Sequence, residues 1–513
     1  MSLRKRIIIN AGSNWVSMAV AAVVGLVLLR VMWSELGKSS YGVWALLSTG
    51  LRYPMILEGA FLLSTNRFVA FYRNDTKELN RFVSASFIML TALAVLTIVA
   101  AVLLSFVISD IFSSAITPKF AHDARITCIL VGVTLAFKIM EATFSGALRG
   151  YQYHTRSNAV VITANLLRAV LTVGLLVAWK SIIAVQLAFG ITAAISALSM
   201  YFVARKSIAG FRINVLKVNR ETIRELFRHT GHATARSGSM IFMFSTLALL
   251  VGKVGSAEDV AVYDVASRIL GFVRGFLVGA QNVFLPAVTS LYANGQIETI
   301  KAVVKKGTRI NSVLTCASLI LLVVFAEEFL TFLLGGDVPS NTAIVMRVLI
   351  MSVVARGFFG IWFPSLVGIG HLRGLTIAAI TAAISVILLE LVLLRGFVTV
   401  TVPMAPAIAL VIVLWAKTGL WLPFYGLHKL GIRPFEYLKD SLYQPLAASL
   451  VSIAVILVLN SVLLKGTFHW LVMLVLATVV VMVTFTFISM RKEAVDLFLA
   501  VRTRLAGAKE HQI

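Results

Sequence analysis

The sequence predicts an all-α polytopic membrane protein with about fourteen transmembrane helices. Of its 513 residues, 59% are hydrophobic and 13% are charged, whereas soluble domains carry roughly 45–50% apolar and about 25% charged residues. The mean hydropathy is +0.93. A helical span needs about 20 apolar residues, and nearly the whole chain divides into such stretches joined by short polar turns. The sequence leaves no room for a sizeable aqueous domain.

Fourteen apolar stretches are long enough to cross a membrane, and two of them contain ionisable residues, those at 41–65 and 260–291. The fourteen cover residues 10–32, 41–65, 82–109, 124–148, 157–179, 182–204, 236–252, 260–291, 310–334, 342–368, 374–395, 401–427, 442–464 and 467–490. We expect an N-terminal lobe of six spans, a basic cytoplasmic linker, a C-terminal lobe of six spans, an appendix of two spans and a cytoplasmic tail. These five parts are residues 1–204, 205–235, 236–428, 429–490 and 491–513.

The charge balance is strongly basic, with 46 Lys and Arg against 22 Asp and Glu and a formal net charge of +24. Such an excess is typical of nucleic-acid-binding proteins, but here the cations are concentrated in alternate loops between apolar stretches. That pattern places the basic loops in the cytoplasm. We therefore expect a multi-pass protein of the bacterial inner membrane with both termini cytoplasmic and with no nucleic-acid partner.

A weak internal repeat relates the two predicted lobes. A shift of 222 residues places Tyr41 on Tyr263 and Arg52 on Arg274. The repeat indicates two copies in the same membrane orientation, related by an axis along the membrane normal. Two such bundles form a transporter architecture, in which the substrate binds between the lobes and access alternates by rocking.

Short motifs link the chain to a known family. They are Asn14-Trp15, Leu36-Gly37-x3-Tyr41-Gly42-x-Trp44, Glu58-Gly59 followed by Arg67, and the Gly-Ala-Leu-Arg-Gly-Tyr-Gln turn at 146–152. On these motifs the sequence resembles the polysaccharide-type flippases of the multidrug/oligosaccharidyl-lipid/polysaccharide (MOP) exporter superfamily, which is related to the lipid II flippase. The resemblance implies transfer of a polyprenyl-diphosphate-linked oligosaccharide from the cytoplasmic to the external leaflet. It also implies membrane lipids, a polysaccharide polymerase and other assembly proteins as partners.

Cationic residues inside or near the predicted spans are the candidate substrate-binding residues, because an Arg near the bilayer centre costs about 2.5–3.5 kcal/mol on insertion scales and therefore needs a reason to be there. Arg52 and Arg274 lie near mid-depth, and neither has an opposite charge three or four residues away. Arg30 and Lys253 form a rougher second pair under the same shift. A diphosphate would supply both the negative charge and the fork-shaped acceptors that guanidinium groups bind. The resemblance to the lipid II flippase branch implies that Arg30, Arg52 and Arg274 line such a cavity.

The remaining charges inside spans have structural and functional interpretations. Arg168 and Arg356 also lie at mid-depth without a local partner, and both interpretations stay open for them. The spacing of Asp264 with Arg268 and of Lys138 with Glu141 favours structural ion pairs. The carboxylates that can be placed deeply are candidates for coupling to H⁺ or Na⁺, and Lys417 shares this interpretation. Glu58, Glu390 and Lys417 have a second interpretation, as cross-helix partners of the arginines. The deep carboxylates are Glu58, Glu141, Asp264 and Glu390.

Two other functions are weighed against the flippase. A cation-coupled multidrug exporter of the same superfamily should line its cavity with carboxylates, but cations outnumber carboxylates inside the spans. A membrane-embedded glycosyltransferase, polymerase or ligase generally needs a large external loop, and the longest external turn, about 109–123, is short. We expect no enzymatic activity, no catalytic residue, no metal site and no cofactor apart from a coupling ion. Pro54, two residues after Arg52, predicts a break in the second span.

Overall fold

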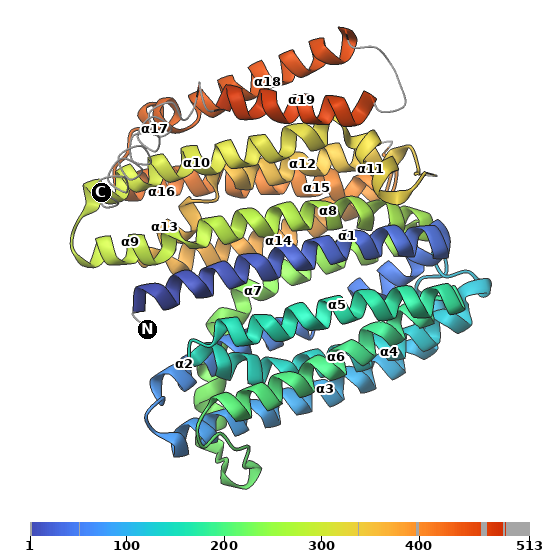
Figure 1. The fold of residues 1–513 in the computed structure, drawn as a ribbon, viewed down its shortest axis with the longest axis vertical. Coiled ribbons are helices and arrows are strands. Elements are labelled where there is room, and N and C mark those ends of the chain that lie inside the picture. The colour runs from blue at the N-terminus through green and yellow to red at the C-terminus, as the bar shows by residue number, and fades with distance from the viewer. Residues whose placement is uncertain are drawn as a thin grey trace, which may run out of the picture. The chain divides into compact units, whose positions relative to one another are not determined.

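The computed structural model describes residues 3–50, 52–336, 338–396, 400–462, 469–485 and 488 (Figure 1). These residues are almost entirely helical, and no strand occurs among them. The helices are α1 (Leu3–Gly50), α2 (Met55–Phe71), α3 (Thr76–Ile111), α4 (Pro118–Gly150), α5 (His154–Trp179), α6 (Ile182–Ser207), η1 (Val215–Lys217), α7 (Arg220–Val254), α8 (Ala257–Asn282), α9 (Phe284–Ala293), α10 (Ile297–Val324), α11 (Ala326–Leu334), α12 (Asn341–Phe359), α13 (Trp362–Gly368), α14 (Leu372–Leu394), α15 (Met404–Leu414), η2 (Trp415–Trp421), α16 (Leu422–Leu430), α17 (Pro434–Ser441), α18 (Tyr443–Val462) and α19 (His469–Thr484). The predicted all-α polytopic membrane fold is confirmed.

The number of separate spans differs from the fourteen expected. Among the described residues, ten helices are long and apolar enough to cross a membrane, or eleven if the bent pair α17 and α18 counts as one span. The expected turn between spans 1 and 2 is present within α1, because its residues form two helices that meet at a kink at Gly37, where φ is 74° and ψ is 169°. Two further apolar helices, Gly238–Val254 and Val475–Thr484, are shorter than the others. The predicted tail, 491–513, lies outside the described residues.

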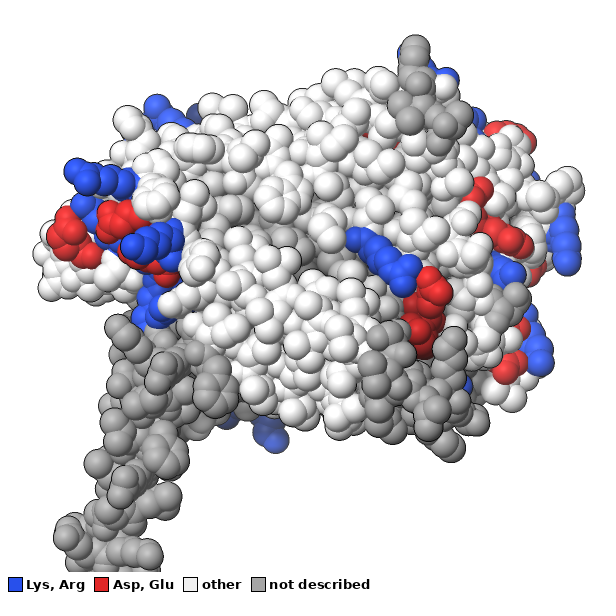
Figure 2. Space-filling view, turned by 90° about the horizontal axis from the view of Figure 1, so that it is seen from above, with Lys and Arg blue, Asp and Glu red and all other residues white. Residues whose placement is uncertain are grey.

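Outward-facing apolar side chains match a lipid environment. Along α3, Leu96, Leu103 and Phe106 are 63–65% exposed, which would be costly in water. On the face drawn in Figure 2, Lys, Arg, Asp and Glu residues gather towards two ends, and uncharged residues cover most of the area between them. This distribution is the one expected for a chain that crosses a bilayer.

The chain forms two compact units. Unit 1 comprises Met1–Ile269, Leu333–Val345 and Thr376–Ala409, and unit 2 comprises Leu270–Phe332, Met346–Leu375 and Leu410–Ile513. In unit 1, α4 packs against α3 and α6, and α5 packs against α1 and α6 (Figure 1). The division into lobes at 1–204 and 236–428 stays a prediction.

The second predicted span is interrupted, as Pro54 indicated. Helix α1 ends at Gly50 and α2 begins at Met55, with Pro54 in the N-cap position of α2. Arg52 lies in the turn between the two helices, and its carbonyl accepts a hydrogen bond from the Met55 amide at 3.0 Å. The break therefore places Arg52 at a helix junction inside the apolar part of the chain.

The basic segment before the seventh span is a packed helix and not only a surface anchor. Helix α7 begins at Arg220, and the Asn219 side chain caps it by accepting the Thr222 amide at 2.9 Å. Leu226 is fully buried in a cluster with Phe61 and Phe82. The predicted linker 205–235 thus contains η1 and the first turns of α7, which pack on α2 and α3.

The start of α8 approaches α1 very closely at Gly42. A methyl group at Gly42 would lie 1.8 Å from the Ala257 carbonyl oxygen, so only glycine allows this contact. Gly37, five residues earlier, has a φ of 74°, a conformation that glycine adopts without strain. Both glycines of the Leu36-Gly37-x3-Tyr41-Gly42-x-Trp44 motif therefore have structural roles.

Gly42→Ala is expected to destabilise the protein by about 3 kcal/mol or more, because the methyl group would collide with backbone and not with a movable side chain. Thermal unfolding in detergent measures the effect. Gly12→Ala, in the part of α1 before the kink at Gly37, is the control, because nothing lies within 4 Å of the added methyl group. Equal melting temperatures for the two variants would contradict the close contact.

Candidate functional site

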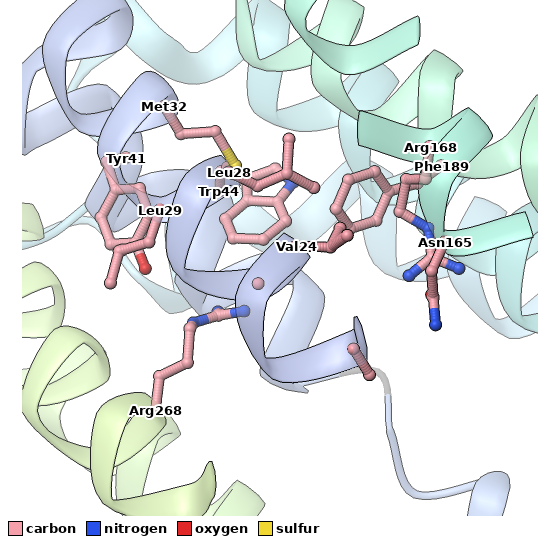
Figure 3. A pocket seen from close by; sticks show the side chains of 12 residues that line it. Val24, Leu28, Leu29, Met32, Tyr41, Trp44, Asn165, Arg168, Phe189 and Arg268 are labelled. Carbon is pink, nitrogen blue, oxygen red and sulfur yellow. The ribbon is translucent and has the colours of Figure 1, made fainter. Parts of the chain in front are cut away.

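A cavity of about 150 Å³ lies in unit 1 among α1, α5, α6 and α8 (Figure 3). Arg168 and Asn165 come from α5, and Arg268 comes from α8 on the opposite side. The rings of Trp44 and Phe189 lie between the two arginines (Figure 3). Apolar residues of α1 complete the wall, namely Ala21, Val24, Gly25, Leu28, Leu29 and Met32, together with Tyr41.

Asp264 holds Arg268 and Tyr41 in place at this cavity. Arg268 donates to both carboxylate oxygens, with Nη2 2.8 Å from Oδ2 and 3.1 Å from Oδ1. The Tyr41 hydroxyl donates to Oδ2 at 2.5 Å. The ion pair predicted from the spacing of Asp264 and Arg268 is confirmed. The tyrosine contact adds a link from α8 to α1, which local spacing does not show.

Aromatic side chains connect the two arginines to the neighbouring helices. The Arg268 guanidinium lies 5.3 Å from the Trp44 ring centre, and that of Arg168 lies 5.1 Å from the Phe189 ring centre. Trp44 Nε1 donates to Gln186 Oε1 at 3.2 Å. Gln186 in turn donates to Thr134 at 2.8 Å, so polar contacts run from α8 through α1 and α6 to α4. The Arg168 Nε atom is buried and has no hydrogen-bond partner among the described residues.

Arg52 belongs to the same neighbourhood. It is exposed, and it lies within electrostatic range of Arg268, Asp264 and Tyr41. The single carboxylate of Asp264 therefore faces two guanidinium groups, Arg52 and Arg268. The region carries a positive excess that an anion would relieve.

A second charged cluster in unit 1 lies between α2 and α4. Lys138 binds Glu141 at 3.3 Å, which confirms the predicted ion pair. Glu58 lies within electrostatic range of Lys138, Glu141 and Arg149. Two carboxylates and two cations balance one another here. Glu58 and Glu141 therefore have cationic neighbours, and their role in coupling stays a prediction.

The rougher predicted pair, Arg30 and Lys253, has other contacts. The Lys253 ammonium donates to the Ile111 carbonyl at 2.7 Å, at the last residue of α3. It therefore binds a backbone acceptor that the helix leaves free at its end. Arg30 is exposed on α1, near Gly335. A substrate-binding role for either residue stays a prediction.

Unit 2 contains a separate group of cations. Arg356 of α12 lies within electrostatic range of Arg274 of α8, and Lys417 of η2 lies within range of Arg356. No ion pair of Arg356 or Lys417 with a carboxylate occurs in the described part of the chain. Arg356 Nε is buried and also has no hydrogen-bond partner there. Arg274 and Arg52 belong to different units, so their predicted convergence on one cavity stays a prediction.

Glu390 differs from the other candidate coupling residues. It lies on α14, it is 0% exposed, and neither carboxylate oxygen has a hydrogen-bond partner among the described residues. Within the same residues, no group of three or more His, Cys, Asp or Glu side chains could hold a metal ion.

Sequence reasoning missed two contributors to these cation groups. Arg268 was assigned to a local ion pair, yet it also faces the cavity. Lys417 was assigned to coupling or pairing, yet it lies beside Arg356 in a π-helix that interrupts an apolar span. The position of Lys417 as a single cation in an apolar stretch was the feature of the sequence that could have indicated this. Gln186 could have been found in the same way, because it is a polar residue in a predicted apolar span, and the structure buries it.

Comparisons with known proteins agree with this structure. A family model described as polysaccharide biosynthesis protein matches residues 35–337, more than half of the chain. Over 368 residues the chain is 22% identical to the uncharacterised membrane protein EpsK of Bacillus subtilis (strain 168), covering 69% of this chain and 71% of EpsK.

Two solved structures share the fold. The lipid II flippase MurJ, in an inward closed conformation, superposes with a TM-score of 0.70 and 16% identity, covering 94% of this chain and 98% of MurJ. An inward-facing multidrug resistance MATE family transporter of the MOP superfamily superposes with a TM-score of 0.67 and 15% identity, covering 81% of this chain and 98% of the transporter. The family model confirms the predicted resemblance to polysaccharide biosynthesis proteins, and the two solved structures share the predicted fold.

Asp264→Asn is expected to destabilise the protein by about 3–5 kcal/mol, because it leaves the Arg268 charge without its carboxylate in a mostly buried site. Thermal unfolding in detergent measures this loss. Replacing both partners, Asp264→Asn with Arg268→Met, should recover part of it, since no uncompensated charge then remains. Strictly additive effects of the two substitutions would show that the pair contributes no coupling energy.

Proposed function

The chain belongs to the family of polysaccharide biosynthesis proteins, and we propose that it flips a polyprenyl-diphosphate-linked oligosaccharide from the cytoplasmic to the external leaflet. The bacterial inner membrane is the site of this step, with both termini in the cytoplasm. Alternating access around a cationic central cavity moves the diphosphate headgroup. A polysaccharide polymerase and other assembly proteins are the partners that the product requires.

The cations of unit 2 are the single observation that carries this proposal. Arg356 and Lys417 lie close enough to interact, and Arg274 lies near Arg356. Like charges in a poorly solvated site repel, so a stable arrangement of this kind favours an anionic ligand. A diphosphate carries more than one negative charge, and its oxygens can accept bidentate hydrogen bonds from guanidinium groups.

The cavity of unit 1 supports the same class of ligand. Arg168 presents a buried Nε without a hydrogen-bond partner among the described residues, and Arg52 adds an exposed guanidinium nearby. Asp264 neutralises one of the local charges, that of Arg268, and Glu141 lies within electrostatic range of Arg168. The aromatic and aliphatic wall formed by α1 also suits the sugar or prenyl part of a substrate.

The rival function, export of organic cations, would need carboxylates free to bind a cationic drug. Two of the four deep carboxylates are committed to cations, Asp264 to Arg268 and Glu141 to Lys138. Glu58 lies among Lys138, Glu141 and Arg149. Glu390 is the exception, since its oxygens have no hydrogen-bond partner among the described residues, but it is fully buried. This distribution favours an anionic substrate over a cationic one.

Binding of undecaprenyl diphosphate to the purified protein tests the proposal. Replacing Arg356 and Lys417 together with Gln should weaken binding by about 100-fold or more, since each charge-assisted hydrogen bond contributes about 1.5–3 kcal/mol and two are lost. Native mass spectrometry with titrated lipid measures the affinity. Undecaprenol, which lacks phosphate, should bind the wild type and the variant equally.

Arg347→Gln is the matched control for that experiment. Arg347 lies on the same helix, α12, but it already binds Glu327 at 2.9 Å and the Val323 carbonyl at 3.1 Å. We expect it to leave undecaprenyl diphosphate binding unchanged. If Arg356→Gln/Lys417→Gln binds this lipid as tightly as the wild type does, the diphosphate site in unit 2 is wrong.

We further propose that Glu390 couples transport to a proton gradient. A carboxylate buried without partners is costly when ionised, so its uptake and release of a proton would accompany a change in solvent access. Glu390→Gln should abolish the acceleration of flipping by an imposed pH gradient in proteoliposomes while preserving undecaprenyl diphosphate binding. The exposed Glu258→Gln serves as control and should keep the acceleration. A gradient response that persists in Glu390→Gln rules out this role.

A further inference from the structure

A second cavity, of about 240 Å³, lies in unit 1 where α3 begins and the chain leaves α6. Its lining is polar and basic: Thr76, Lys77, Asn80 and Arg81 from α3, and Arg212 and Asn214 from the segment after α6. Three of these six side chains are cationic. None of them lines the cavity between Arg168 and Arg268 or belongs to the cation group of unit 2.

Hydrogen bonds hold the two walls of this pocket together. Asn80 Nδ2 donates to the Gly210 carbonyl at 2.8 Å, and Asn80 Oδ1 accepts the Arg212 amide at 3.0 Å. The Asn214 amide donates to Ser84 at 2.8 Å. Because the bond of Arg212 uses its backbone, its guanidinium is not needed to keep the walls in place.

The positive charge of the pocket is only partly neutralised. Arg81 binds Glu78 at 3.1 Å, and its Nε atom is buried without a hydrogen-bond partner in the described part of the chain. The Asp75 carboxylate caps α3 by accepting the Lys77 and Glu78 amides. Lys77 and Arg212 have no ion-pair partner within the residues that the structure describes. Cations, side-chain amides and a threonine hydroxyl together are the donors that bind phosphate oxygens.

Exposed apolar residues next to the pocket favour a phosphate that is part of a membrane lipid. Leu216 is 93% exposed and Val215 is 50% exposed, both in η1, immediately after Asn214. The Leu216 amide donates to Asn214 Oδ1 at 3.2 Å, which fixes η1 against the pocket. Apolar side chains next to cations are the combination that anchors protein segments at an anionic membrane surface.

We propose that this pocket binds the phosphate group of an anionic phospholipid, with Leu216 and Val215 inserted among the adjoining acyl chains. Lys77 and Arg212 supply the uncompensated charges, and Asn80 and Asn214 keep the walls at a fixed separation. The site is distinct from the proposed transport path, so the proposal does not depend on the identity of the substrate that is flipped.

Native mass spectrometry of the full chain, with phosphatidylglycerol and phosphatidylcholine as probes, tests the proposal. The wild type should bind phosphatidylglycerol more tightly, and Lys77→Gln/Arg212→Gln should weaken that binding by about tenfold without changing phosphatidylcholine binding. The matched control is Arg205→Gln/Lys206→Gln, which removes two exposed cations from the last turn of α6 outside the pocket. Equal phosphatidylglycerol affinity in the two double variants would overturn the proposal.

Two further measurements separate the lipid from a soluble phosphate and a binding defect from misfolding. Inorganic phosphate and pyrophosphate should not displace phosphatidylglycerol at millimolar concentration, and Leu216→Gln should weaken phosphatidylglycerol binding alone. Displacement by either soluble anion, with Leu216→Gln unchanged, would overturn the lipid assignment. Lys77→Arg/Arg212→Lys should restore binding, and a failure of this charge-preserving variant, with an unchanged melting temperature, would also count against the proposal.

Discussion

The contact of Asp264 with Arg268 and Tyr41 is the interaction on which the unit 1 cavity depends. A buried carboxylate is stable only if its oxygens are satisfied, and here one guanidinium and one phenol satisfy them. The same contact joins α8 to α1, since Tyr41 lies on α1. It also aims Arg268 at Trp44, from which hydrogen bonds lead through Gln186 to α4. Four helices thus share one polar network in an otherwise apolar interior.

If the proposed diphosphate binds at this cavity, the same network moderates the charge that it meets. If Arg52, Arg168 and Arg268 were all uncompensated, a diphosphate would bind tightly and leave slowly, which would slow a transport cycle. Asp264 offsets one of these charges in unit 1, whereas Arg356 and Lys417 of unit 2 have no such carboxylate among the described residues. Under the 222-residue shift, Asp264 falls on Gly42, so the N-terminal copy has no counterpart of this acid.

The features that could be predicted from the sequence are those that depend on the spacing of residues within one helix. Partners three or four residues apart on one helix must meet, so the Asp264–Arg268 and Lys138–Glu141 pairs were predictable, as was the break at Pro54. Contacts between helices depend on packing, and therefore the bond of Lys253 to Ile111 and the link from Trp44 to Gln186 were not. The turn between the first two apolar stretches was also predictable, because the residues between them are polar, and the structure has a kink there at Gly37.

Irregular backbone accompanies a cation in each unit, and this coincidence bears on mechanism. Arg52 lies in the break between α1 and α2, and Lys417 lies in the π-helix η2, where the Leu422 amide donates to the Lys417 carbonyl. Non-regular backbone inside a membrane is tolerated where it is buried in protein or lines a polar cavity, and π-helical turns often mark functional sites. Each irregularity also makes a helix easier to bend at the cation it carries. Bending at Arg52 and at Lys417 would change which side of the membrane those charges face, so the residues proposed to hold the headgroup lie at the points where the helices can yield.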